Sequence, residues 1–197
     1  MKTIYQNAWN HSYTYEDYLK LVDQKIDNKL STGHEQNEML ADFTKLNRAR
    51  MKRLDKTQQI LPELEKAVKA IRVPQIWLVL TESWCGDAAQ HLPVFNKLSA
   101  LNPLIELRLV LRDDNDELMQ KYLTKGGRSI PKLIVVSDDM ETTLFDWGPR
   151  PKVAQVEVER LLHEQGGFND AVKEGIQVWY NKDEGRSLQE ELMKLMK

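Results

Sequence analysis

Residues 75–98 read Gln-Ile-Trp-Leu-Val-Leu-Thr-Glu-Ser-Trp-Cys-Gly-Asp-Ala-Ala-Gln-His-Leu-Pro-Val-Phe-Asn-Lys-Leu. Residues 75–81 form an apolar run typical of a buried strand, and the residues from Ala88 onward favour a helix. Cys85, the single cysteine of the chain, lies where the strand passes into the helix. Because the first amide groups of a helix stabilise an anion, we expect this position to favour a thiolate.

The composition is that of an ordinary soluble globular protein, with 41% hydrophobic and 29% charged residues among 197. A formal net charge of −2 gives no reason to expect nucleic acid or a membrane as a partner. The N-terminal residues lack the apolar region of a secretory signal, and a single cysteine agrees with a reducing compartment. We therefore expect a cytoplasmic protein. The oligomeric state stays open.

The chain up to about residue 57 has a helical pattern. Thr14 to Asp17 fits a capping box that opens one helix, which ends before Gly33, and a second helix is expected over about 35–56. The end of this second helix is basic, with Arg48, Arg50, Lys52, Arg53 and Lys56. These cations either form a solvated helix face, which the helix dipole favours, or include one or two arginines that reach back to the thiol.

From residue 61 onward the pattern alternates between helices and strands. Strands are expected over 75–81, 104–111, 132–137 and 142–147. Helices are expected to follow Pro62, Cys85, one of the caps Asp113 and Asp114, and Pro151. Two helical pieces finish the chain, and the last opens with a capping box at 187–190. The first crossover predicts a parallel pair of strands, and the short turn at 137–140 predicts an antiparallel pair.

This order of elements resembles the thioredoxin fold. Trp84-Cys85-Gly86 is similar to the start of the thioredoxin motif Trp-Cys-Gly-Pro-Cys, and Ile130-Pro131 resembles the loop that carries a cis-proline in that family. Three further stretches, 81–90, 46–51 and 147–151, resemble a group of bacterial thioredoxin-like proteins with a helical N-terminal extension. The resemblance implies that Pro131 packs against the active-site sulfur and helps to bind an extended peptide.

The resemblance implies a three-layer α/β fold in which a mixed four-stranded sheet is flanked by helices, with additional helices at both ends. We expect a helical N-terminal extension over 1–58, packed on a thioredoxin-like domain with C-terminal helices over 59–197. Three positions depart from the thioredoxin pattern. Ala88 stands in place of the resolving cysteine, Asp87 in place of proline, and Val79 in place of a buried aspartate. A dithiol cycle within one chain is therefore excluded.

The candidate site is centred on Cys85 as the nucleophile. The residues expected to bind substrate around it are Trp84, Gly86, Asp87, Arg128, Ile130 and Pro131. Asp87 and Glu82 disfavour a thiolate through their charge, and Arg128 either faces Cys85 and offsets them or is a surface residue on an exposed loop.

Other polar and aromatic residues carry weaker indications of function. His91 is a poor candidate for a base, because its helix face also carries Ala88 and Leu92. Loop packing explains the stretch from Trp147 to Arg150 better than a role in the site. Four scattered histidines without a second cysteine predict no metal site, and the sequence predicts no cofactor.

Three functions fit these residues. The favoured one is a monothiol disulfide oxidoreductase in cell redox homeostasis, in which Cys85 attacks a protein or low-molecular-weight disulfide and an external thiol resolves the mixed disulfide. The alternative is a non-catalytic thioredoxin-fold module that binds a peptide or protein in a groove lined by Trp84, Pro131 and Trp147. Glutathione-assisted iron–sulfur binding by a dimer ranks last, because the chain has no glutathione signature.

Overall fold

The computed structural model describes residues 3–196 and contains one four-stranded sheet enclosed by helices. The strands are β1 (Gln75–Thr81), β2 (Ile105–Leu111), β3 (Lys132–Ser137) and β4 (Thr143–Trp147). They lie in the order β2-β1-β3-β4. β1 and β2 are parallel, whereas β3 is antiparallel to both of its neighbours. The sequence predicted this mixed sheet, and the α/β thioredoxin-like architecture is confirmed.

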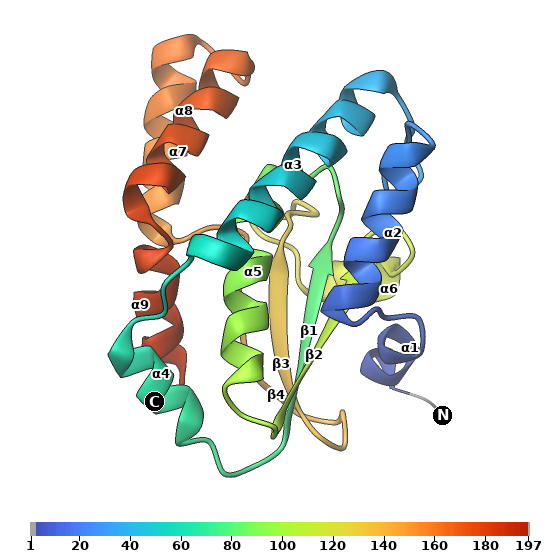
Figure 1. Cartoon of the computed structure of the whole chain (residues 1–197), viewed down its shortest axis with the longest axis vertical. Helices are drawn as coiled ribbons and strands as arrows, with labels where there is room; N and C mark the ends of the chain where they lie inside the picture. Colours follow the sequence, from blue (N-terminus) through green and yellow to red (C-terminus); the bar gives the residue numbers. More distant parts are fainter. Residues whose placement is uncertain (1–2, 197) are drawn as a thin grey trace.

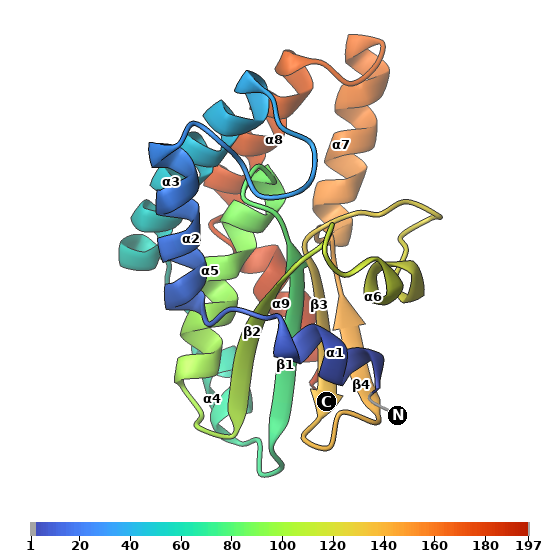
Figure 2. The ribbon, with the colours of Figure 1, turned by 90° about the vertical axis from the view of Figure 1, so that its right-hand side faces the viewer.

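Helices cover both faces of the sheet (Figures 1 and 2). On one face lie α5 (Gly86–Ala100) and the C-terminal α9 (Arg186–Leu195), and on the other lie α1 (Ile4–Asn10) and α6 (Asp116–Lys121). β1 is buried over nearly its whole length, as a central strand between two helical layers should be. Trp77 and Leu80 are completely buried within it.

Further helices extend this core at both ends of the chain. The N-terminal additions are α2 (Tyr15–Asp27), which contacts the β2 edge, and α3 (Glu38–Thr57), which packs across α5. α4 (Pro62–Lys69) connects α3 to β1. After β4 come α7 (Lys152–Gln165) and α8 (Asp170–Asp183), which pack against each other as a hairpin. Figure 1 shows α3 and the α7–α8 hairpin on either side of the upper end of α5.

Local signals explain most helix starts. The Thr14 side chain accepts a hydrogen bond from the Asp17 amide at the start of α2, and the Asn37 side chain does the same for Leu40 at the start of α3. α1 opens with a capping box formed by Thr3 and Gln6, a signal that the sequence interpretation did not use.

Two predicted helix caps are wrong. The N-cap of α6 is Asn115, not Asp113 or Asp114. Asp113 is engaged elsewhere, because its carboxylate pairs with Arg112 and accepts from the His34 amide.

The second wrong cap is the capping box expected at 187–190. The N-cap of α9 is Gly185, two residues before Ser187, at φ +73°. Ser187 already lies inside the helix and donates its hydroxyl to Asp183. A polar residue marks a helix start only if no nearby group competes for its side chain.

Candidate functional site

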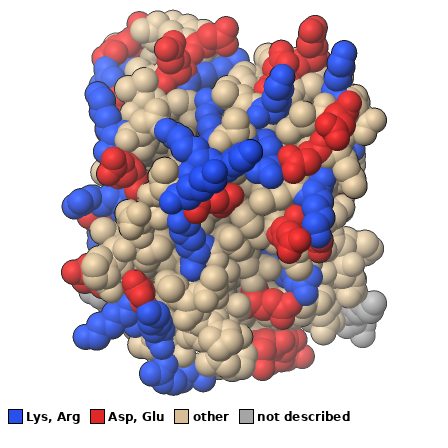
Figure 3. Space-filling view, in the orientation of Figure 1, with Lys and Arg blue, Asp and Glu red and all other residues tan. Residues whose placement is uncertain are grey.

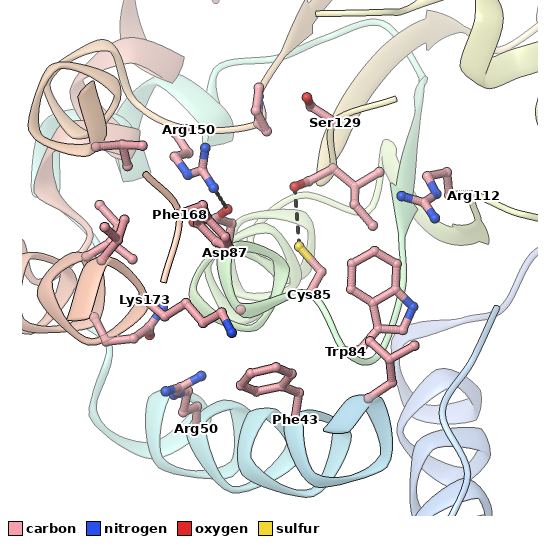
Figure 4. A pocket seen from close by; sticks show the side chains of 18 of the residues that line it. Phe43, Arg50, Trp84, Cys85, Asp87, Arg112, Ser129, Arg150, Phe168 and Lys173 are labelled. Atoms are coloured by element: carbon pink, nitrogen blue, oxygen red, sulfur yellow. Dashed lines mark hydrogen bonds and ion pairs between the residues drawn. The ribbon is translucent and has the colours of Figure 1, made fainter. Parts of the chain in front are cut away.

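Cys85 is the N-cap of α5, and its sulfur lies between the helix and the loop before β3. The Ala88 amide donates to Cys85 Sγ at 3.4 Å, and the thiol donates to the Ile130 carbonyl oxygen at 3.3 Å. The Ile130–Pro131 peptide bond is cis. The fold thus brings together the two segments that carry the resemblance, and the dashed line at the Cys85 sulfur in Figure 4 marks this hydrogen bond.

The surroundings of Cys85 nevertheless favour the protonated thiol over the thiolate. Cys85 is only 7% exposed. Burial, and then the charge of Asp87, raise the pKa of Cys85 to about 12, despite the helix amides and Arg150, which act in the opposite direction. The expectation of a lowered pKa from the helix N-terminus is therefore wrong, because desolvation outweighs a partial dipole charge at this depth.

Asp87 does not cap the helix but enters a buried network. Its carboxylate pairs with Arg150 at 2.5 Å and accepts from the Tyr180 hydroxyl at 2.7 Å. Tyr180 comes from α8, so this network ties the C-terminal hairpin to the start of α5. Within this network, Arg150 is the cation that offsets the negative charge of Asp87 next to the thiol. The sequence interpretation assigned Arg150 to loop packing and gave Tyr180 no role.

Arg128 does not pair with a group beside Cys85. Its guanidinium pairs with Asp116 at 3.2 Å and Asp113 at 3.5 Å. It still lines the pocket described below, so it lies near the site, but Arg150 rather than Arg128 offsets the charge of Asp87.

His91 is a packing residue. It lies edge-on to the rings of Trp147 and Tyr180, with centroids 5.1 and 5.2 Å away, and is 2% exposed. Burial and the charge of Arg150 lower the pKa of His91 to about 3. A histidine that stays neutral among aromatic rings is a poor base for Cys85.

A pocket of about 500 Å³ opens over Cys85 (Figure 4). Trp84 lies on its wall with the Arg112 guanidinium 4.9 Å from the ring centroid. Ile130 and Pro149 line the pocket, and Pro131 is buried next to them. Gly86 also lines the pocket, and a Cβ there would lie 3.2 Å from the Gln177 amide nitrogen, so a larger residue would displace the end of that side chain.

Much of the pocket wall comes from helices outside the motif. α3 contributes Met39, Leu40, Phe43 and Arg50, and the α7–α8 hairpin contributes Val158, Phe168, Val172, Lys173, Ile176 and Gln177. The sequence interpretation missed these residues, except that Arg50 was one of the arginines considered to reach the thiol. The apolar residues of α8 recur at helical spacing, but that signal cannot distinguish a pocket wall from core packing.

Within residues 3–196, no group of three or more His, Cys, Asp or Glu side chains is arranged to hold a metal ion. None of the helices in that range is both long enough and apolar enough to cross a membrane.

The mixed sheet, the thiol at the start of α5 and the adjacent cis-proline loop define a thioredoxin-fold protein. A family model described as Thioredoxin matches residues 33–163, so the chain belongs to the thioredoxin superfamily. The matched range includes α3 as well as the sheet.

Two solved structures are similar to this chain in fold, and the similarity gives no information about function. A protein of unknown function from Pseudomonas aeruginosa is similar, with a TM-score of 0.59 and 17% identity over 94% of this chain and 99% of that one. An HIV epitope scaffold is similar with a TM-score of 0.51 and 17% identity, over 86% of this chain and 99% of that one. No curated protein matches the chain.

Proposed function

We propose that this thioredoxin-like protein exchanges thiols and disulfides through Cys85 as a single nucleophile. The observation that carries the proposal is the position of the sulfur in the wall of a pocket, between the first turn of α5 and the Ile130 carbonyl. Small organic disulfides or protein disulfides would be its substrates, and the cytoplasm is the compartment that suits a lone reduced cysteine.

The reaction balances without a second cysteine. The Cys85 sulfur attacks one sulfur of a disulfide, the bond between the two substrate sulfurs breaks, and the departing thiolate takes up the proton that Cys85 gives up. An external thiol then attacks the mixed disulfide and releases Cys85. Ala88, at the place of a resolving cysteine, leaves this second step to the external thiol.

The raised pKa of Cys85 slows the reaction of its thiol with a disulfide in the absence of other effects. A pKa near 12 instead of 8.5 lowers the thiolate fraction at neutral pH by roughly 3,000-fold, and the higher intrinsic nucleophilicity recovers only about 40-fold. The net deficit of roughly 100-fold requires a compensating effect. A bound substrate held against the sulfur supplies one, since effective concentrations within a site reach far above those in solution.

The same pKa favours a second candidate, a binding module without redox chemistry. In that case the pocket would bind a ligand without reacting with it, and the protonated Cys85 would only line the pocket. The two functions differ in whether the sulfur forms a bond.

Mixed-disulfide formation distinguishes them. The native protein is incubated with 2-hydroxyethyl disulfide and its intact mass is measured before and after dithiothreitol. We expect one adduct that dithiothreitol removes, and none on the Cys85→Ser variant. If an adduct forms only after unfolding in urea, the thiol is merely buried and the exchange function is refuted.

A further inference from the structure

Most of the charged residues that line the pocket over Cys85 are cations. Among its lining residues are five cations, Arg50, Arg112, Arg128, Arg150 and Lys173, and a single carboxylate, that of Asp87. The Asp87 charge is compensated by Arg150. Walls of low polarity around a charge of one sign focus its field on an entering ligand.

Arg50 differs from the other four cations in its pairing. Arg112, Arg128, Arg150 and Lys173 each pair with an aspartate. Within residues 3–196, Arg50 pairs with no carboxylate and donates to the Asn47 side-chain oxygen at 2.8 Å. Burial lowers the pKa of Arg50, which is the sign of a partly desolvated charge without full compensation.

Arg50 also lies beside the first turn of α5. One of its terminal nitrogens would be 3.7 Å from a Cβ built on Gly86, the residue that follows Cys85. Lys173 reaches across from α8 into the space above Phe43, with its Nζ 5.1 Å from that ring centroid (Figure 4). The Arg50 guanidinium therefore lies beside the N-terminus of α5, with the Lys173 ammonium above the neighbouring Phe43, and all three favour an anion.

The remaining wall is mostly apolar, with Ser129 and Gln177 as its polar residues. Phe43 from α3 and Val172 and Ile176 from α8 line it, together with Phe168, which is 65% exposed. Figure 3 shows basic side chains gathered over the middle of the face that α3 crosses. The pocket therefore combines cationic side chains with apolar surface.

We infer that this pocket receives a small organic anion, with an apolar body between α3 and α8 and its anionic group next to Arg50 and the start of α5. The inference rests on the proposed function in one respect: it makes the disulfide substrate a low-molecular-weight anion rather than a folded protein. A volume of about 500 Å³ lies within the range of small-molecule sites, and a sulfur in a residue 7% exposed is poorly placed to meet a large surface.

Binding without chemistry tests this inference. Isothermal titration calorimetry on the Cys85→Ser variant compares 3-phenylpropionate with 3-phenylpropanol and 3-phenylpropylamine, which share the apolar body. We expect the carboxylate to bind at least about tenfold more tightly than either of the others, because it alone pairs with the cations. This comparison needs no change in Arg50.

The role of Arg50 is tested in the same background. Arg50→Gln should weaken 3-phenylpropionate binding by about tenfold or more, whereas Lys52→Gln, an exposed residue of the same helix, should change it by less than about twofold. Arg50→Lys, which keeps the charge, should restore part of the affinity.

Equal affinities for the three probes, binding of none of them, or full affinity in folded Arg50→Gln would overturn the inference. None of these results depends on the sulfur. A failure of the exchange function would appear instead as the absence of the mixed disulfide, with anion binding intact.

Discussion

Cys85 is subject to two opposite physical effects. The Ala88 amide and the start of α5 favour a thiolate, whereas burial and the Asp87 carboxylate favour the protonated thiol. A helix dipole contributes less than about 2 kcal/mol even in favourable sites, which is under two pKa units. Desolvation of a fully buried group shifts a pKa by up to about 3–5 units, so burial prevails.

Replacing Asp87 should shift this balance measurably. Asp87→Asn keeps the side-chain shape but removes the negative charge that raises the pKa of Cys85, and it leaves the Arg150 charge uncompensated beside the thiol. The pKa should fall, and alkylation by iodoacetamide at pH 8 should accelerate by about three- to fourfold for each unit of the fall, because the lower pKa also reduces the nucleophilicity of the thiolate.

The full pH profile of the alkylation rate provides the reference for that experiment. In the native wild type the rate should still rise at pH 10, whereas the urea-unfolded chain should level off above about pH 8.5. Asp138→Asn, in the exposed hairpin turn, is the matched control and should leave the rate unchanged. An equally slow Asp87→Asn protein that remains folded would show that Asp87 does not control the thiol.

Gly148 lies where the loop after β4, which carries Pro149, meets the loop before β3, which carries Pro131. Gly148 has φ +123°, and a Cβ there would lie 2.3 Å from the Pro131 carbonyl oxygen. No side chain fits at that distance, so the end of β4 can lie against the loop that faces Cys85 only if residue 148 is glycine.

Gly148→Ala should therefore destabilise the protein far more than a glycine replacement in open space. We expect a loss of more than about 3 kcal/mol of unfolding free energy, against about 1 kcal/mol for Gly126→Ala. Gly126 has φ +79° but no atom within 4 Å of its Cβ position, so it controls for backbone strain alone. Urea denaturation measures both, and similar losses would contradict the close approach.

At the level of elements, the sequence predicted strands better than helix starts. β1 and β3 were predicted to the residue, because branched apolar runs bounded by polar residues and proline have few alternatives. The caps of α6 and α9 were misassigned, because Asp113 and Ser187 are engaged by partners that no local pattern reveals.

At the level of the whole molecule, the site forms because helices from the N-terminal and C-terminal parts of the chain both pack next to the start of α5. α3 from the N-terminal side and α8 from the C-terminal side enclose the pocket, and the Tyr180–Asp87 hydrogen bond fixes α8 to the motif. The sequence indicated Cys85 and its neighbours through a local motif. It could not indicate Phe43, Lys173 or Ile176 as pocket residues, since their position depends on how distant helices pack.

The buried His91 should make the stability of the whole fold sensitive to acid. Its pKa is about 3 in the folded protein and about 6.5 in the unfolded chain. Below pH 6.5 the unfolded chain binds more protons, so stability falls as the pH drops from 6.5 toward 3. The loss attributable to His91 should reach about 2 kcal/mol at pH 5.

Urea denaturation at pH 7 and pH 5 measures this loss. His91→Gln should lose about 2 kcal/mol less than the wild type between the two values, while the exposed His163→Gln should behave as the wild type does. An identical loss in wild type and His91→Gln would mean that the histidine is protonated within the fold.

The most direct measurement of the central claim is the rate at which Cys85 forms a mixed disulfide with two disulfides of opposite charge, 3,3′-dithiodipropionate and cystamine. The ratio of the two rates is determined for the native protein and for the chain unfolded in urea, at low ionic strength. We predict that folding shifts the ratio toward the anionic disulfide by about tenfold or more, because the pocket cations act only in the folded protein. A ratio unchanged by folding, or shifted toward cystamine, would contradict a cationic pocket that delivers its substrate to Cys85.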